Sequence, residues 1–436
     1  MTPRPDAALR ARIEHTIRFL AVDAVERAKS GHPGAPMGLA AAAFELWNGH
    51  LRFDPTEPDW PLRDRFVLSN GHASMLLYAL LHLFGYRVSL DDLRAFRQLG
   101  SPTPGHPEYG HTPGVETTTG PLGQGFATGV GMALAARLVR ARFGPDGPGN
   151  HLVYGIVSDG DLMEGVSAEA GSLAGHLGLG NLIYLYDDNR ITIDGPTSLA
   201  FSEDVAMRFT AQRWHVQKID GNDADALAAA LQAARAEAER PSLIVMRTTI
   251  GYGSPNLAGQ SKTHGAPLGP DEARAAKEAV GWPLEPDFLV PDDVRSFFAE
   301  RARAKQAERA ERDAALARWR AADPERAAAW EALRAKPVPE GFAAELAAAL
   351  DGKKAATRKH SGEVIQRAAK VLPWLVGGSA DLAESNATLV KGGGDVGPAA
   401  AAGVDPFAGR NLHFGIREHA MGAVSNGIAL DGAFVP

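Results

Sequence analysis

The chain has 436 residues, of which 45% are hydrophobic and 22% charged, an ordinary globular composition with room for roughly two or three domains. Its formal charge of −7 leaves no concentrated basic surface, so we expect no nucleic-acid partner. The absence of cysteine excludes disulfides, thiolate metal sites and cysteine nucleophiles. With no apolar run near the ~20 residues that cross a bilayer and no secretory pattern at the start, we expect a soluble, cytoplasmic protein without a membrane partner.

Helical and strand-like segments alternate along the chain. Apolar residues at helical spacing predict a helix over residues 6–29, and the glycine- and proline-rich residues 30–34 end it. Short apolar runs predict buried strands at residues 66–68, 152–157, 182–186, 243–246 and 374–376. Helices are expected between them, for instance at residues 129–142 and 223–238. This alternation predicts an α/β fold with a mainly parallel, helix-covered sheet.

Residues 293–350 differ from the rest in composition, because Arg, Glu and Ala dominate them. Such a segment favours solvated helices with charge pairs four residues apart, and we interpret it as a connector. We therefore predict a first domain over residues 1–320, a helical charged linker over 321–354 and a second α/β region over 355–436.

Polar residues follow several of the predicted strands directly. The strand ends at Leu68, Val157, Tyr186 and Val376 are followed by Ser-Asn-Gly-His, Ser-Asp-Gly-Asp, Asp-Asp-Asn and Gly-Gly-Ser-Ala-Asp. In open α/β sheets, ligands bind beyond the carboxyl ends of the strands. We expect these four segments to converge along one sheet edge, although polar residues also make simple turns after strands.

Asp159 and Asn189 form a candidate cation site. If their strands are neighbours, a carboxylate and an amide oxygen face each other, and the backbone carbonyl of Ile191 could be a third ligand. Mg²⁺ prefers oxygen ligands of this kind, supplemented by phosphate and water. The alternative is structural: Asp159 caps the next helix and Asn189 makes an Asx-turn.

Four histidines lie in glycine-rich loops, where the backbone can approach a ligand closely. They are His32, His72, His106 and His264. Imidazoles bind phosphates and sugar hydroxyls and move protons near neutral pH. Each histidine taken singly could also be an ordinary turn or core residue. No His-Glu-x-x-His pattern occurs, so a zinc protease is not expected.

Two further segments can carry chemistry. The glycine-rich residues 120–125 lead into a helix, as loops that hold phosphate on backbone N–H groups do, but they match neither the Walker nor the Rossmann pattern. Glu418 heads a helix of small residues, where partial desolvation would let it share a proton with a ring nitrogen. The alternative for Glu418 is a salt bridge with Arg417.

Taken together and in this order, these segments resemble the transketolase family of thiamine-diphosphate enzymes. The resemblance runs from residue 30 to residue 420 and includes residues 158–165, 186–195, 264–268, 377–386 and 414–420. It implies a thiamine-diphosphate-binding fold, with a diphosphate-binding domain followed by the beginning of a similar pyrimidine-binding domain. It also implies a homodimer whose active sites lie at the interface.

The resemblance assigns a role to each candidate residue. For the cofactor and its cation (Mg²⁺, or Ca²⁺ or Mn²⁺), the cation ligands are Asp159, Asn189 and the Ile191 carbonyl, the diphosphate contacts are His72, His264 and Gly160, and the pyrimidine contacts are Gly120 and Leu122. For the sugar-phosphate substrates, the hydroxyl contacts are His32, His106 and His264, and the phosphate contacts are Arg358 and Ser385. Asp381 is the acid beneath the cofactor, Glu418 is the catalytic glutamate, and Glu164 and Glu169 join the two active sites of a dimer.

The implied activity is transfer of a two-carbon ketol unit from a ketose phosphate to an aldose phosphate in the pentose phosphate pathway. Two features depart from the family pattern. Ser158 stands where the family usually has glycine, which is acceptable if its backbone angles are ordinary. Family members also continue well beyond the Glu418 segment, so we expect a truncated or split transketolase with a C-terminal partner polypeptide. The alternatives are a dihydroxyacetone synthase and a non-catalytic fragment.

Overall fold

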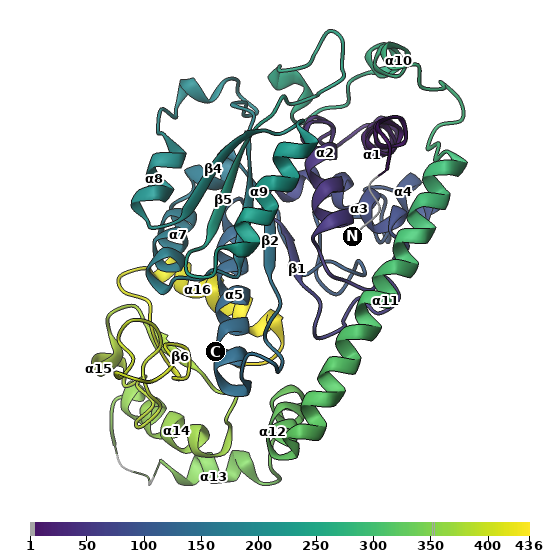
Figure 1. Cartoon of the computed structure of the whole chain (residues 1–436). Coiled ribbons are helices and arrows are strands. Elements are labelled where there is room, and N and C mark those ends of the chain that lie inside the picture. The colour runs from purple at the N-terminus through teal and green to yellow at the C-terminus, as the bar shows by residue number, and fades with distance from the viewer. Residues whose placement is uncertain (1–4, 351, 353) are drawn as a thin grey trace.

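The computed structural model describes residues 5–350, 352 and 354–436, and its centre is a five-stranded parallel sheet (Figure 1). The strands follow the spatial order β1 (Arg65–Leu68), β2 (Val153–Ser158), β3 (Leu182–Asp188), β5 (Ser242–Arg247) and β4 (His215–Asp220). The predicted α/β fold with a mainly parallel sheet is confirmed. The sequence analysis missed β4, whose alternating polar residues leave it only half-buried at the sheet edge.

The predicted strand at residues 374–376 is wrong in position. The strand of that region is β6 (Gly377–Ser379), which pairs in parallel with β7 (Asn411–His413) in a separate two-stranded sheet. Residue Leu375 makes only an isolated bridge with Val435. The apolar run therefore precedes the strand instead of forming it.

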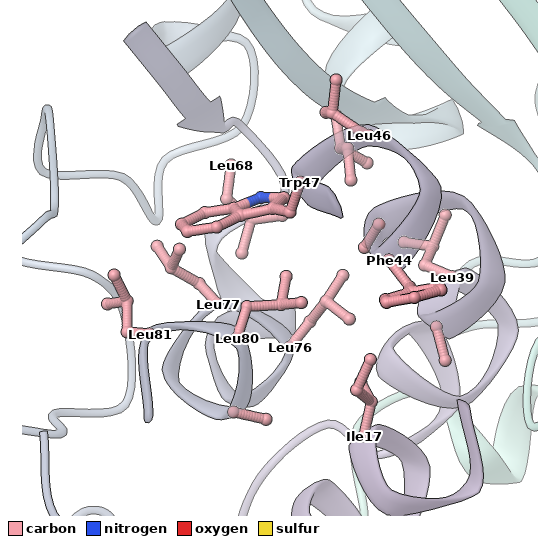
Figure 2. Close-up of a cluster of buried hydrophobic side chains, with 14 of the residues drawn as sticks. Ile17, Leu39, Phe44, Leu46, Trp47, Leu68, Leu76, Leu77, Leu80 and Leu81 are labelled. Atoms are coloured by element: carbon pink, nitrogen blue, oxygen red, sulfur yellow. The ribbon is translucent and has the colours of Figure 1, made fainter. Parts of the chain in front are cut away.

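Helices cover both faces of the main sheet. One face packs against α1 (Ala7–Ala28), α2 (Gly34–Gly49), α3 (Ser74–Leu83) and α9 (Ala224–Ala236), and the other against α5 (Gln124–Phe143), α7 (Gly165–Leu177) and α16 (Glu418–Asp431). Alternate residues of one strand serve the two layers, so that Tyr154 and Ile156 face the first and Val153 and Val157 the second. Figure 2 shows part of the first layer, in which Trp47 of α2 lies over the leucines of α3.

The remaining helices are short or belong to the connector. They are α4 (Leu90–Arg94), α6 (Asp159–Met163), α8 (Val205–Ala211), α10 (Pro270–Ala279), α11 (Asp292–Ala322), α12 (Pro324–Ala335), α13 (Phe342–Ala348), α14 (Thr357–Val371) and α15 (Ala383–Asn386), with 3₁₀ turns η1 (Gly71–Ala73), η2 (Thr197–Leu199) and η3 (Ser261–Thr263). None of the helices in the described ranges is long and apolar enough to cross a membrane.

The long helix α11 is not simply solvated, as its composition suggested. It runs beside the first layer of helices (Figure 1), and it buries Phe298, Arg301 and Lys305. Lys305 donates to the Leu51 carbonyl (2.5 Å) and Arg301 to the Asn48 carbonyl (2.8 Å), both at the end of α2. Cations are favourable at the carboxyl end of a helix, so these contacts fasten the connector to the first layer.

The crossing of α5 and α16 joins the end of the chain to the main sheet. A Cβ at Gly131 would overlap the Val424 carbonyl, and one at Gly427 would overlap the Thr128 carbonyl. The two backbones are therefore in direct contact, which only glycine permits. At the far end of α16, buried Asp431 pairs with His151 (2.8 Å) and Arg65 (3.2 Å).

Candidate active site

Three of the four polar segments meet at the carboxyl edge of the main sheet. His72 lies in the turn after β1, Asp159 directly follows β2, and Asn189 directly follows β3. These three strands are parallel neighbours. The fourth segment does not join them, because Asp381 follows β6 in the other sheet. The expectation that all four converge on one edge is therefore wrong for that segment.

Asp159 is buried and held by two donors. The Tyr186 hydroxyl donates to Oδ1 (2.5 Å) and the Arg190 backbone N–H to Oδ2 (2.9 Å). Burial raises the pKa of Asp159 to about 6, although these two donors oppose the shift. Asp159 does not cap α6, because Ser158 and Asp161 form that capping box. Ser158 has φ −116° and ψ 176°, which any residue adopts, so its replacement of glycine brings no strain.

Asn189 makes the Asx-type bond that the structural alternative foresaw. Its Oδ1 accepts from the Ile191 N–H (2.9 Å), and its Nδ2 donates to Asp187 Oδ2 (2.8 Å). The amide oxygen keeps a second lone pair, and no described residue donates to the Ile191 carbonyl. The described chain holds no group of three or more His, Cys, Asp or Glu that could bind a metal. The carboxylate, amide and carbonyl oxygens instead suit a hard cation such as Mg²⁺ or Ca²⁺.

The glycine-loop histidines form a cluster. The ring centroids of His32, His72 and His264 lie 5.0 to 5.8 Å apart, and His72 stacks on His264. The ring of His106 lies against Gly120, where an added Cβ would be 3.3 Å from it. The sequence analysis named these histidines as a set because of their glycine-rich loops, and the fold brings His32, His72 and His264 together.

Burial keeps this cluster neutral. It lowers the pKa of His32 to about 4 and the pKa of His72 well below its ordinary value, with the neighbouring imidazoles adding to both shifts. Burial also lowers the pKa of His106 and of His264. Neutral imidazoles have one donor and one acceptor nitrogen each, so near neutral pH they can accept or donate protons at a bound hydroxyl group.

Two residues that the sequence analysis passed over support the cluster and its loops. Arg97 lies 3.5 Å from His32 Nδ1, and no pattern in its segment signals this. Asp161 accepts from the Ser69 hydroxyl (2.6 Å), the Gly123 N–H (2.8 Å) and the Ser158 N–H (2.9 Å). It thereby ties the loops after β1 and β2 to the glycine-rich loop before α5, and its place in the Ser-Asp-Gly-Asp segment was the available signal.

Several buried polar groups in these loops lack a hydrogen-bond partner among the described residues. They are the Asn70 amide, the Thr119 hydroxyl and His264 Nδ1. Buried polar groups are almost always satisfied, so these groups call for a polar ligand or ordered water. Together with the oxygens of Asp159 and Asn189, they fit a cation and a diphosphate-bearing cofactor.

The pyrimidine and acidic contacts lie at the rim of this region. Gly120 and Gly123 have positive φ (149° and 78°), and Leu122 lies between them. A Cβ at Gly160 would be 2.8 Å from the Leu122 side chain, so the loops of Gly160 and Leu122 touch. Glu164 is exposed and its Cβ approaches Gly123, whereas Glu169 accepts from the Ala420 N–H of α16 (2.9 Å).

Glu418 begins α16 and is exposed. The expected partial desolvation is therefore absent within one chain. The alternative salt bridge is absent as well, because the Arg417 guanidinium donates to the Phe414 carbonyl (2.9 Å) and to the Ser172 hydroxyl (3.0 Å). The Glu418 side chain is thus accessible to a group from outside the chain.

The candidate sugar-phosphate residues lie in the second region. Asp381 and Ser385 line an open pocket of about 770 Å³ at the ends of β6 and β7, and Asp381 has the uncommon left-handed φ of 61°. Arg358 is exposed on α14. In Figure 1, β6 and α15 lie at the opposite end of the molecule from α2 and α10. One chain therefore does not bring this pocket against its own histidine cluster.

Comparison with known proteins identifies the family of the chain. Residues 9–339 match the family model described as the transketolase thiamine diphosphate binding domain, and residues 353–436 match the transketolase pyrimidine binding domain. The chain belongs to the transketolase family. A transketolase of Geobacillus stearothermophilus is 54% identical over 96% of this chain.

Solved transketolases share the fold. One from Pichia stipitis, in complex with sedoheptulose 7-phosphate, is 45% identical with a TM-score of 0.92 and matches 98% of this chain. One from Leishmania mexicana is 42% identical with a TM-score of 0.92 and matches 99% of this chain. The chain spans 62% of the length of the Geobacillus relative and 64% of each of these two structures.

Proposed function

We propose that the chain carries the cation- and diphosphate-binding side of a transketolase active site. The activity is transfer of a two-carbon ketol unit from a ketose phosphate to an aldose phosphate, as in the pentose phosphate pathway. The observation that carries this proposal is the meeting of Asp159, Asn189 and the half-buried histidine cluster at one sheet edge. The relatives named above are transketolases, which favours this activity over that of a dihydroxyacetone synthase.

The residues at the sheet edge divide into cation, diphosphate and pyrimidine contacts. Asp159, Asn189 and the Ile191 carbonyl would hold Mg²⁺, Ca²⁺ or Mn²⁺, because all three offer oxygen. His72, His264 and Gly160 would contact the diphosphate, and the backbone of Gly120 and Leu122 the pyrimidine. The unpartnered nitrogen of His264 supports this assignment.

When bound, thiamine diphosphate supplies the electron sink for breaking the carbon–carbon bond beside a ketose carbonyl. The chain supplies orientation and proton control. His32, His106 and His264 are neutral near pH 7 because burial lowers their pKa values, so each can accept or donate a proton at a substrate hydroxyl.

We place the complementary residues on a second copy of the chain. Asp381, Arg358, Ser385 and Glu418 are exposed, and the pocket of Asp381 and Ser385 lies away from the histidine cluster of the same chain. A homodimer could set them against the partner's sheet edge, with Glu164 and Glu169 near the junction. The Pichia relative was solved in complex with sedoheptulose 7-phosphate, which supports a sugar phosphate as the substrate class, and we assign its phosphate contacts to Arg358 and Ser385.

The domain layout predicted from the sequence remains our proposal: 1–320 diphosphate-binding, 321–354 helical linker, 355–436 pyrimidine-binding. The helices α12 and α13 lie within residues 321–354, and the match to the pyrimidine-binding model begins at residue 353, which supports the second boundary, whereas the first match runs on to residue 339. The cytoplasmic location stays a prediction.

The test is ketol transfer from xylulose 5-phosphate to ribose 5-phosphate, with Mg²⁺ and thiamine diphosphate, by the purified 436-residue chain. Turnover by the chain alone would exclude the non-catalytic alternative. Turnover only with a co-expressed downstream polypeptide would support a split enzyme. Absence of turnover in both cases, together with no cofactor binding in calorimetry, would refute the proposal.

A further inference from the structure

Asp187 is a buried carboxylate at the end of β3 that no candidate role uses. Its residue is 1% exposed, and no Lys, Arg or His of the described chain forms an ion pair with it. It accepts hydrogen bonds from the Thr248 hydroxyl and from Asn189 Nδ2 (2.8 Å). Burying a carboxylate without a cation beside it is costly in free energy. The two hydrogen bonds that Asp187 accepts therefore point to its role in the structure.

The bond to Asn189 determines which end of that amide faces the candidate cation site. An amide has a donor nitrogen and an acceptor oxygen, and rotating it by half a turn exchanges them. In the observed orientation, Nδ2 donates to Asp187, and Oδ1 accepts from the Ile191 N–H. The reversed orientation would set an oxygen against the Asp187 carboxylate and an N–H against the Ile191 N–H. It would also turn hydrogens toward a cation.

Strand geometry makes this contact possible. Asp187 and Asn189 are two positions apart at the end of a strand, so their side chains lie on the same side. In the sheet register, Asp187 is paired with Ser158, which directly precedes Asp159. The Arg190 N–H, next to Asn189, donates to Asp159 (2.9 Å). Asp187 thus contacts Asn189 directly and lies on the strand position next to the residue that precedes Asp159.

We propose that Asp187 is a positioning residue, which holds Asn189 with its amide oxygen toward the site and thereby sets the affinity for a divalent cation. Thr248 holds Asp187 in turn. This inference rests on the proposed cation site. Residues that orient metal ligands commonly change metal affinity by about 10- to 100-fold when they are replaced.

The first test measures Mg²⁺ affinity by calorimetry on the full chain at pH 8 with saturating thiamine diphosphate. Asp187→Leu removes the acceptor and keeps the branched shape of the side chain, and we expect at least about tenfold weaker binding. Asp187→Asn should stay within about threefold of wild type, because its amide oxygen can accept from Asn189 while its nitrogen donates to the Thr248 oxygen. Equal losses in the two variants would show that charge and not orientation acts, and would overturn the proposal.

The second test exchanges the two side chains. Asn189→Asp alone sets two carboxylates against each other, and we expect a large loss of Mg²⁺ affinity. The double variant Asp187→Asn with Asn189→Asp restores a donor–acceptor pair, and we expect at least about tenfold recovery over Asn189→Asp. No recovery in a double variant that melts at the wild-type temperature would overturn the positioning role.

These outcomes separate the two proposals. If the wild-type chain binds no Mg²⁺ with the cofactor, the cation site itself is refuted, and this inference falls with it. If wild type binds and Asp187→Leu binds equally well, only the positioning role is refuted.

Discussion

The edge of the main sheet and the region after residue 355 differ in how far their candidate residues are buried. At the sheet edge, Asp159 is buried and His32, His72 and His264 are half-buried, and neighbours from several loops hold them. In the second region, Arg358 and Ser385 are exposed. The first set is thus organised by its own chain, whereas the second is open to solvent.

This difference follows from how the two regions are built. The sheet edge lies between two layers of helices, and Asp161 joins three of its loops. The second region has a two-stranded sheet and short helices, and its pocket is open. In the first region, burial lowers the pKa of His32 and raises that of Asp159, and such shifts are typical of sites with acid–base chemistry.

The largest expected loss of stability comes from disrupting the α5–α16 crossing, which joins the two regions. Gly427→Leu should lower the free energy of unfolding by about 3 kcal/mol or more, because its side chain would overlap the Thr128 carbonyl. Urea unfolding followed by circular dichroism measures this. Gly422→Leu on the same helix is the control, since a Cβ there meets nothing within 4 Å. Similar losses in both variants would contradict the direct backbone contact.

The next effect concerns the cation site. Asp159→Ala should weaken Mg²⁺-dependent binding of thiamine diphosphate by about 100-fold, because it removes the only carboxylate among the proposed ligands. Calorimetry measures the affinity. Asp188→Ala is the control, since that carboxylate faces Arg190 and Arg247 instead. Unchanged affinity in Asp159→Ala would refute the assignment.

The sequence predicted the sheet edge better than its surroundings. Strands β2 and β3 were recognisable because they are short apolar runs followed at once by polar residues. These polar residues lie at the carboxyl edge of the sheet, as predicted. The edge strand β4 was missed because its burial is partial. The segment at Asp381 was misplaced because a strand's sequence does not say which sheet it joins.

The roles of Arg97 and Asp161 depend on contacts between distant segments, so local patterns alone could not assign them. The role of Asp187 depends on a local contact with Asn189, but only the fold shows that this carboxylate is buried and bonded to that amide. The exposure of Glu418 was unpredictable for a related reason. Helical spacing places it at the start of α16, but only the packing of α16 on α5 and α7 shows that no neighbour covers it.

The pH dependence of stability tests the second contact between α16 and the main sheet, in which Asp431 pairs with His151 and Arg65. Burial alone would raise the pKa of Asp431, but His151 and Arg65 outweigh it and lower the pKa to about 2, below the ordinary value near 3.8. A carboxyl whose pKa falls on folding stabilises the folded chain above the unfolded pKa. This contribution, about 2 kcal/mol, is lost as the pH falls from about 4 towards 2.

Unfolding of wild type and Asp431→Asn between pH 3 and 7 measures the effect. We expect the variant to be less stable at pH 7 and the difference to shrink as the pH falls. A difference that stays constant over this range would show that Asp431 is not an ionised partner of His151 and Arg65.

The smallest effect on stability is expected at Glu418, an exposed residue of the second region. Glu418→Ala should change the free energy of unfolding by less than about 0.5 kcal/mol and leave cofactor affinity intact, since the side chain is exposed. Glu169→Ala, one helix away, should cost about 1 kcal/mol, because it removes the acceptor of the Ala420 N–H. If Glu418 acts only across a dimer interface, its replacement should stop exchange of the thiamine C2 proton, followed by NMR, in an assembled site. Normal exchange in that variant would remove Glu418 from the catalytic role, and a stability loss matching that of Glu169→Ala would show that it serves its own chain instead.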